Sequence, residues 1–443
     1  MNDIVKIGCG SAYASDWLEP AKALADSGLV DYLAFDCLAE RTLALAQIRK
    51  LADPSTGQDL RLARIMEDFA GFLGSNRTIV GNFGAANPDA AAADVVAGAR
   101  KAGLDGLRVG VIRGDDVLKQ VLDLDVALPE RGVTAGQVRD RIVSAHAYIG
   151  AEPVVELLGE GARFVLGGRI ADPSLFVGPI CHELGWDLDD WASVGVATVA
   201  GHLLECGIHV TGANFADPPL RVLPALHDLA APFAQVTSDR RVIVGKLDGT
   251  GGGVTEATVK TQLGYEVNDP AAYLTPDVTA DFSALQVREI GPDRVEVTGA
   301  GGQAAPERLK VLVGLDLGFD VVGEVSYGGP GCVERARLAA DVMRERFAPF
   351  AEGIDELRVD LLGVDALFEG RLQRGYPAEV RLRLAVRCAD CDTATAVAEH
   401  VEFLYFAVAG GGGVTKSMRP AIGVTPAYLD RDTVRLETEV VTA

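Results

Sequence analysis

Residues 245–282 read GKLDGTGGGVTEATVKTQLGYEVNDPAAYLTPDVTADF and bring three local signals together. A short β-like run at residues 241–244 predicts a strand, and the residues after the glycines, 255–263, predict a helix. A strand, a glycine loop and a helix in this order present backbone N–H groups to an anion. The stretch therefore predicts a phosphate site, with a plain glycine hinge as the alternative. Its residues are Thr250, Gly251, Gly252, Gly253 and Lys260.

The bulk composition describes a globular chain of more than one domain. With 443 residues the chain is too long for one ordinary core, and 48% hydrophobic with 23% charged residues is typical of folded proteins. A formal net charge of −22 argues against nucleic acid and against anionic membrane surfaces as partners. We expect a small-molecule substrate and a homo-oligomer.

The location that the sequence favours is the cytoplasm. No run of about 18 apolar residues predicts a transmembrane helix. The first residues, MNDIVKI, enter a strand pattern directly and lack the regions of a signal peptide. Seven scattered cysteines fit free thiols in a reducing compartment.

The first half, residues 1–235, predicts an α/β domain. Apolar strands alternate with helices, one of them expected over residues 136–149, and this alternation predicts a mostly parallel, Rossmann-like sheet. The expected strands are residues 4–7, 31–35, 78–80, 107–112 and 163–166. The second half, residues 236–443, predicts an α+β domain with a mixed or antiparallel sheet, because grouped strands are interrupted by two long helices, residues 331–347 and 393–407.

Polar residues follow each expected strand of the first half. In a parallel sheet ligands bind beyond the carboxyl ends of the strands. Asp36 follows the second strand, and Arg169 and Asp172 follow the fifth. We expect these three residues at an anion or acid–base site, with Arg169 as a carboxylate or thioester clamp that Asp172 orients. Gly8 and Gly10 with Asp36 also resemble a dinucleotide fingerprint, but Tyr13 stands where the third glycine belongs.

A predicted helix over residues 197–206 carries a candidate catalytic trio. His202, Glu205 and Cys206 are three and four residues apart, so their side chains share one helix face. This pattern predicts Glu205 as acid or base, His202 as its partner and Cys206 as a candidate nucleophile. A buried thiol and a structural histidine are the alternative. We predict no metal, since zinc would need a further ligand, for which His209 is the nearest.

A further glycine loop, residues 410–413, leaves a predicted helix. Gly411, Gly412 and Lys416 extend the predicted phosphate site, although the loop also fits a helix C-cap. The coenzyme A moiety of a substrate carries such phosphates.

Several blocks resemble the acyclic terpene utilisation (AtuA-type) family, in that family's order. They are GNFGAANPDA (81–90), GGRIADPSL (167–175), GHLLECGIHVTGANF (201–215), the central GTGGGVTEATVKTQLGYEVNDPAAYLTPDVTADF (249–282) and AGGGG (409–413). The resemblance implies a role in operons for citronellol and geraniol breakdown through branched acyl-CoA intermediates. Some members carry a further small ferredoxin-like domain, which we expect as a separate partner protein here.

Three hypotheses follow. The first is a cytoplasmic enzyme with hydratase or lyase chemistry on a branched acyl-CoA or the corresponding acid, because such reactions need a positioned acid and base. The second is a non-catalytic metabolite-binding or scaffold partner of an acyl-CoA carboxylase-type complex. A nucleotide-dependent enzyme that uses Gly8, Gly10 and Asp36 is a third reading.

Overall fold

The computed structural model describes residues 2–369, 371, 375–406 and 409–443. The chain divides into two compact units. Unit 1 comprises Met1–Gly314 and Val424–Ala443, and unit 2 comprises Leu315–Gly423.

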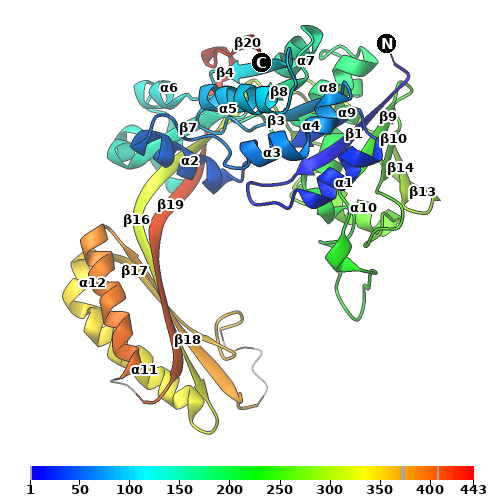
Figure 1. Cartoon of the computed structure of the whole chain (residues 1–443). Helices are drawn as coiled ribbons and strands as arrows, with labels where there is room; N and C mark the ends of the chain where they lie inside the picture. Colours follow the sequence, from blue (N-terminus) through cyan, green and yellow to red (C-terminus); the bar gives the residue numbers. More distant parts are fainter. Residues whose placement is uncertain (1, 370, 372–374, 407–408) are drawn as a thin grey trace. The chain divides into compact units, whose positions relative to one another are not determined.

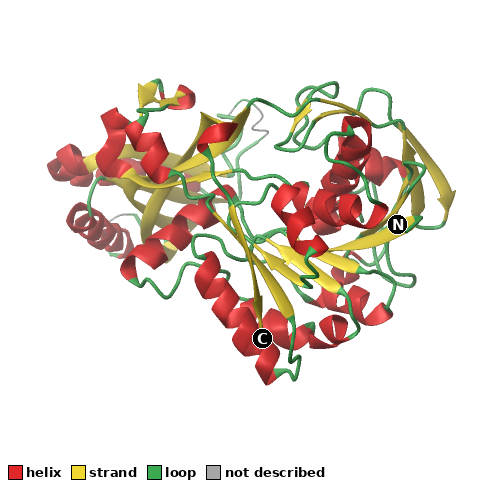
Figure 2. Ribbon diagram, turned by 90° about the horizontal axis from the view of Figure 1, so that it is seen from above, coloured by secondary structure: helices red, strands yellow, loops and turns green. Residues whose placement is uncertain are grey.

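Unit 1 is built on one ten-stranded sheet (Figures 1 and 2). Five neighbouring central strands are parallel: β1 (Ile4–Ser11), β2 (Tyr32–Phe35), β3 (Thr78–Gly81), β8 (Phe164–Leu166) and β4 (Arg108–Arg113). Antiparallel strands extend both edges: β9 (Phe233–Thr237), β10 (Val242–Gly245), β14 (Arg294–Thr298) and β13 (Gln286–Gly291) beyond β1, and β20 (Glu437–Thr442) beyond β4. The predicted α/β class with mostly parallel N-terminal strands is confirmed.

Helices cover both faces of this sheet, because successive strand residues point to opposite sides. Leu33 and Phe35 of β2 join one core, and Tyr32 and Ala34 join the other. The first core is completed by α1 (Glu19–Ser27), α3 (Leu62–Asp68), α4 (Ala70–Gly74) and α5 (Pro88–Lys101). The second is completed by α7 (Glu152–Gly159), α8 (Ser174–Leu184), α9 (Trp191–Glu205) and α10 (Glu256–Leu263).

The boundary between the units differs from the expected division after residue 235. Strands β9, β10, β14 and β13 continue the sheet of the first half, since β9 pairs with β1 over five residues from Ile4 to Gly8. Near the end of the chain, β20 also returns to unit 1, where it pairs with β4. Backbone pairing, rather than sequence order, therefore places these segments.

The helix predicted over residues 136–149 is wrong. Gly136–Arg141 forms a 3-10 helix, and β7 (Ile142–Ala147) is a strand that pairs with β16 (Arg308–Gly328). β-Branched Ile142 and Val143 favour a strand, and β16 supplies the partner that local sequence does not show. The remaining elements of unit 1 are α2 (Glu40–Ala52), α6 (Leu118–Asp123), β5 (Ala127–Leu128), β6 (Val133–Thr134), β11 (Tyr273–Leu274), β12 (Thr279–Asp281) and β15 (Gly301–Gln303).

Unit 2 has the ferredoxin-like order of strands and helices. Its elements are β16 from Leu315 on, α11 (Cys332–Phe347), β17 (Ile354–Leu362), β18 (Glu379–Cys388), α12 (Cys391–Val401) and, up to Gly423, β19 (Gly412–Asp430), with sheet order β17-β18-β16-β19. Both helices pack on the same face of the sheet (Figure 1). The helix expected over residues 393–407 ends at Val401, and Ala407 lies outside the described residues.

No helix in the part of the chain that the structure describes combines the length and apolarity that a bilayer-spanning segment needs.

Candidate functional site

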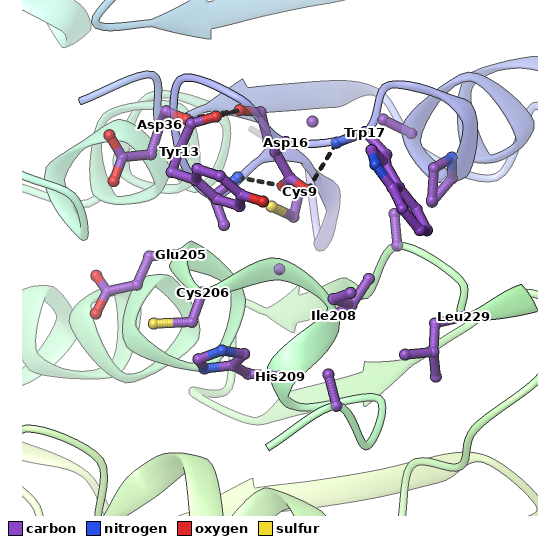
Figure 3. A pocket seen from close by; sticks show the side chains of 18 of the residues that line it. Cys9, Tyr13, Asp16, Trp17, Asp36, Glu205, Cys206, Ile208, His209 and Leu229 are labelled. Carbon is purple, nitrogen blue, oxygen red and sulfur yellow. Dashed lines mark hydrogen bonds between the residues drawn. The ribbon is translucent and has the colours of Figure 1, made fainter. Parts of the chain in front are cut away.

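A cavity of about 1350 Å³ in unit 1 lies at the carboxyl ends of three parallel strands. Ser11 ends β1, Asp36 follows β2 and Arg169 follows β8, and all three line the cavity. Glu205 and Cys206, at the end of α9, project from the opposite wall (Figure 3). The cavity therefore brings the strand ends and part of the predicted trio together.

Glu205 lines this cavity and has one unpartnered carboxyl oxygen. The residue is 9% exposed. Its Oε1 lies 3.0 Å from Nδ1 of His202, whereas Oε2 is buried and has no hydrogen-bond partner among the described residues. Burial raises the pKa of Glu205 above its ordinary value, because removal from water disfavours the charged form.

The second nitrogen of His202 fixes the protonation of this pair. Nε2 lies 3.0 Å from the backbone oxygen of Gln262 on α10. Because a carbonyl oxygen only accepts, Nε2 carries a hydrogen, and one further proton is shared between Nδ1 and Glu205 Oε1. Glu205 can therefore take a proton at Oε2 while it passes one from Oε1 to His202.

Aromatic rings and a glutamine hold His202 in place. Tyr273 and Phe282 pack with ring centroids 5.0 and 5.6 Å from the imidazole. The side chain of Gln262 donates to the backbone oxygen of His202 at 3.1 Å, so α9 and α10 are joined by bonds in both directions. The helix that follows the glycine loop thus orients the imidazole.

Asp36 is a second buried carboxyl in the cavity wall, 5% exposed. Its Oδ1 accepts from the side chain of Asn82 at 2.7 Å and from the backbone of Leu38 at 3.0 Å. Burial, followed by the charge of Asp172, raises its pKa well above the ordinary value. Asp36 and Glu205 are therefore carboxyls that keep protons at a higher pH than exposed ones do.

Arg169 is the buried cation of the site, and it is already paired. Its Nη2 lies 2.7 Å from Asp172 Oδ1, and its guanidinium lies 4.1 Å from the ring centre of Tyr148. Its backbone N–H donates to Asp115 Oδ2 at 2.8 Å, and the same oxygen lies 2.9 Å from Nδ1 of His146. A substrate carboxylate would have to share the guanidinium with Asp172.

Cys206 lines the cavity, but its environment does not favour a thiolate. Burial, with the charge of Glu205, raises the pKa of Cys206 to about 12. Burial also raises the pKa of Cys9, on the opposite wall, well above its usual range. The electrostatics therefore argue against Cys206 as the predicted nucleophile, since a protonated thiol is a weak one.

A comparison with protein-family models decides the family. Residues 5–440 match the model described as acyclic terpene utilisation family protein AtuA. The chain belongs to this family. Membership implies a role in acyclic terpene utilisation and confirms the resemblance of the sequence blocks. Comparisons with curated proteins and with solved structures find no match.

The family's central block does not form the predicted phosphate loop. The N–H groups of Gly251, Gly252 and Gly253 donate to the backbone oxygens of Asp228, Pro224 and Thr211 at 2.8, 2.8 and 2.9 Å. These amides are occupied, so they cannot cradle an anion as the loop pattern predicts. Only Thr250 of the predicted loop residues lines the cavity.

The predicted phosphate-binding lysines are engaged elsewhere. Lys260 forms an ion pair with Glu256 on the surface of α10. Gly411, Gly412 and Lys416 belong to unit 2, where Lys416 lies 2.5 Å from Glu402. A phosphate role for the unit 2 residues stays a prediction.

Sequence reasoning missed the lysine that holds the glycine loop. Lys246 is 1% exposed. Its ammonium lies 3.0 Å from the backbone oxygen of Thr250 and 3.1 Å from Asp293 Oδ2. The apolar run before Lys246 indicates a buried strand end, but Asp293 lies in the turn between β13 and β14, and no local signal connects the two.

Tyr148, Lys310 and Gln262 were also missed, because each approaches the site from a distant element. Lys310 lies 3.0 Å from Glu40, and its ammonium lies 4.8 Å from the ring centre of Tyr148. Both residues line the cavity, and Gln262 reaches it through His202. Only the pairing of β7 with β16 makes Tyr148 and Lys310 neighbours.

Acidic side chains dominate the cavity wall. The acidic residues in its lining are Asp16, Glu19, Asp36, Glu40, Asp172, Glu205, Asp228 and Glu266, and the permanent cations are Arg169 and Lys310. This balance disfavours a polyanionic phosphate group inside the cavity. Over the described ranges, no group of three or more His, Cys, Asp or Glu side chains is arranged to hold a metal ion.

Proposed function

We propose that the protein is an enzyme of acyclic terpenoid breakdown. It adds water to, or removes water from, a carbon–carbon double bond of a branched unsaturated acid or its thioester. The family supports the substrate class, and the two buried carboxyls support acid–base chemistry. A carboxyl with a raised pKa is a stronger base than an exposed one and still holds a proton nearer neutral pH.

In the hydration direction Glu205 acts as the base. Its Oε2 takes a proton from water as the water oxygen attacks the β-carbon, and Oε1 passes a proton to Nδ1 of His202. Asp36 gives its proton to the α-carbon, so the product gains one O–H and one C–H bond. Proton return from His202 to Asp36 through solvent restores the enzyme, and dehydration runs the same steps in reverse.

The observation that carries this proposal is the unpartnered Oε2 of Glu205. An isolated buried carboxyl oxygen costs free energy, because it loses its hydrogen bonds to water and gains none. Glu205 lines the cavity, and its Oε1 contacts His202, whose Nε2 is already bonded to the backbone oxygen of Gln262. Perturbed, unsatisfied groups of this kind concentrate at catalytic sites.

The test is the Glu205→Gln variant, which keeps the shape and removes the exchangeable carboxyl proton. Geranic acid and its coenzyme A thioester serve as probes, and incorporation of solvent deuterium at the α-carbon is followed by NMR. We expect Glu205→Gln to lower the rate by about 10²- to 10⁴-fold. Glu266→Gln, which removes an exposed cavity carboxylate, and Cys206→Ser should retain the wild-type rate.

The proposal fails if the wild-type protein incorporates no deuterium into either probe. It also fails if the Glu205→Gln protein, with an unchanged circular dichroism spectrum, incorporates deuterium as fast as the wild type. In the first case a stoichiometric partner recovered with the wild-type chain would support the non-catalytic alternative instead.

A further inference from the structure

A second cavity, of about 520 Å³, adjoins the first within unit 1. We call it the side cavity. Tyr148, Asp172 and Lys310 line both cavities, so they form a shared wall. Asp172 lines the first cavity together with Asp36 and Glu205, so the shared wall belongs to the cavity that holds the acid–base groups.

The lining of the side cavity differs from that of the first. It is largely apolar, and its principal side chains are Pro173, Tyr273, Leu274, Pro276, Leu309 and Tyr428. Prolines have few accessible conformations, so these walls lose little entropy when a ligand orders them. A volume of about 520 Å³ lies within the usual range for small-molecule sites.

Tyr273 connects this lining to the catalytic pair. It lines the side cavity, and its ring packs 5.0 Å from that of His202. The neighbouring Leu274 is 67% exposed, and Tyr428 is 44% exposed, so apolar surface stands in solvent at the outer end. Exposed apolar surface that continues from a reaction site indicates a binding groove for an apolar group.

We propose that the side cavity binds the branched hydrocarbon chain of an acyclic isoprenoid substrate and thereby sets chain-length preference. The inference rests on the proposed function, which places the reacting carbons at Glu205 and Asp36 in the first cavity. The polar end occupies the acidic first cavity, and each isoprene unit beyond the reacting one extends along the proline walls. The two cations that line the side cavity already have partners: Lys310 is paired with Glu40 at 3.0 Å, and the Arg308 guanidinium lies 5.6 Å from the ring centre of Tyr428.

The experiment measures binding rather than turnover. Isothermal titration gives the dissociation constants of 3-methylbut-2-enoic, geranic and farnesoic acids, which add one isoprene unit at each step. We expect wild-type affinity to rise at least about tenfold from the first acid to the second, because the added carbons leave water. The affinity ratio is the dissociation constant of the first acid divided by that of the second, and Leu274→Asp should reduce it at least about tenfold. Leu220→Asp should leave it unchanged, because Leu220 is 84% exposed and lies outside both cavities.

Tyr428→Ala gives a second variant that removes apolar wall without adding charge, and it should lower the ratio in the same direction. The inference is overturned if wild-type affinity does not depend on chain length. It is also overturned if both variants keep the wild-type affinity ratio. A third contrary result is that Arg308→Gln and added salt weaken the binding of all three acids equally while Leu274→Asp has no effect, since an anionic group would then occupy the cavity.

The same titrations on Glu205→Gln protein separate this inference from the proposed function. If the affinity ratio persists in Glu205→Gln, the side cavity binds the hydrocarbon chain regardless of the effect of this variant on turnover. Loss of deuterium incorporation in Glu205→Gln, together with an unchanged affinity ratio in both Leu274→Asp and Tyr428→Ala, would leave the acid–base proposal standing and refute the side cavity.

Discussion

Replacement of Lys246 by methionine should destabilise unit 1 strongly. The Lys246 side chain is 2% exposed, and it pairs with Asp293, whose side chain is 27% exposed. The ammonium also lies 3.0 Å from the backbone oxygen of Thr250 and 3.3 Å from its hydroxyl. Methionine keeps much of the volume but removes every one of these hydrogen bonds.

The expected loss follows from what remains buried. Breaking a fully buried ion pair from one side costs about 3–5 kcal/mol, because the other charge stays uncompensated. Asp293 is partly exposed and still accepts the hydrogen bond from the backbone N–H of Val254 at 2.9 Å in the variant. Water and this amide therefore offset part of the cost. The carbonyl of Thr250 loses a charged donor, which adds about 1.5–3 kcal/mol before relaxation. We expect a net loss of about 3 kcal/mol.

Urea unfolding followed by tryptophan fluorescence measures this loss. Trp17, Trp186 and Trp191 are the tryptophans of the chain, and all lie in unit 1, so the signal reports the unit that contains Lys246. Lys260→Met is the matched control, because Lys260 is 57% exposed and a surface pair contributes about 0–1 kcal/mol. A loss below about 1 kcal/mol for Lys246→Met, or equal losses for both variants, would refute the reasoning.

The remaining predictions concern the glycine loop and the buried carboxyls. Gly251→Ala should cost about 3 kcal/mol, because its Cβ would lie 1.9 Å from the backbone oxygen of Ala225. Gly249→Ala, with φ of +77° and nothing near its Cβ, should cost only about 1 kcal/mol, and similar urea midpoints for the two variants would contradict this. Burial raises the folded-state pKa of Glu205, so its contribution to stability is complete below the unfolded-state pKa and is lost as pH rises through the folded-state pKa. Stability measured from pH 5 to pH 8 should therefore fall less in Glu205→Gln than in the wild type, and parallel curves would show that Glu205 does not hold its proton.

The sequence by itself determined the α/β class and the family. Strand and helix periods depend on residues that are neighbours in the chain, so the parallel strands of the first half could be predicted before their partners were known. The polar residues after those strands followed from the same reasoning, because parallel strands end at one edge. The spacing of His202 and Glu205 also fixed their common helix face, since one helical turn sets it.

Only the tertiary structure decided how these residues are used. The loop at residues 249–253 has the sequence of an anion site, yet the amides of residues 251–253 donate to backbone oxygens within residues 211–228. The loop sequence alone gives no information on these distant acceptors. Lys246 and Lys260 carry the same charge, but only the pairing of β10 with β14 buries Lys246 beside Asp293. The state of Glu205 depends on Gln262, 57 residues further on, because its carbonyl fixes the proton on the far side of His202. Local sequence sets backbone conformation and residue chemistry, whereas burial, and with it pKa and hydrogen-bond occupancy, is set by whichever distant segment packs on top.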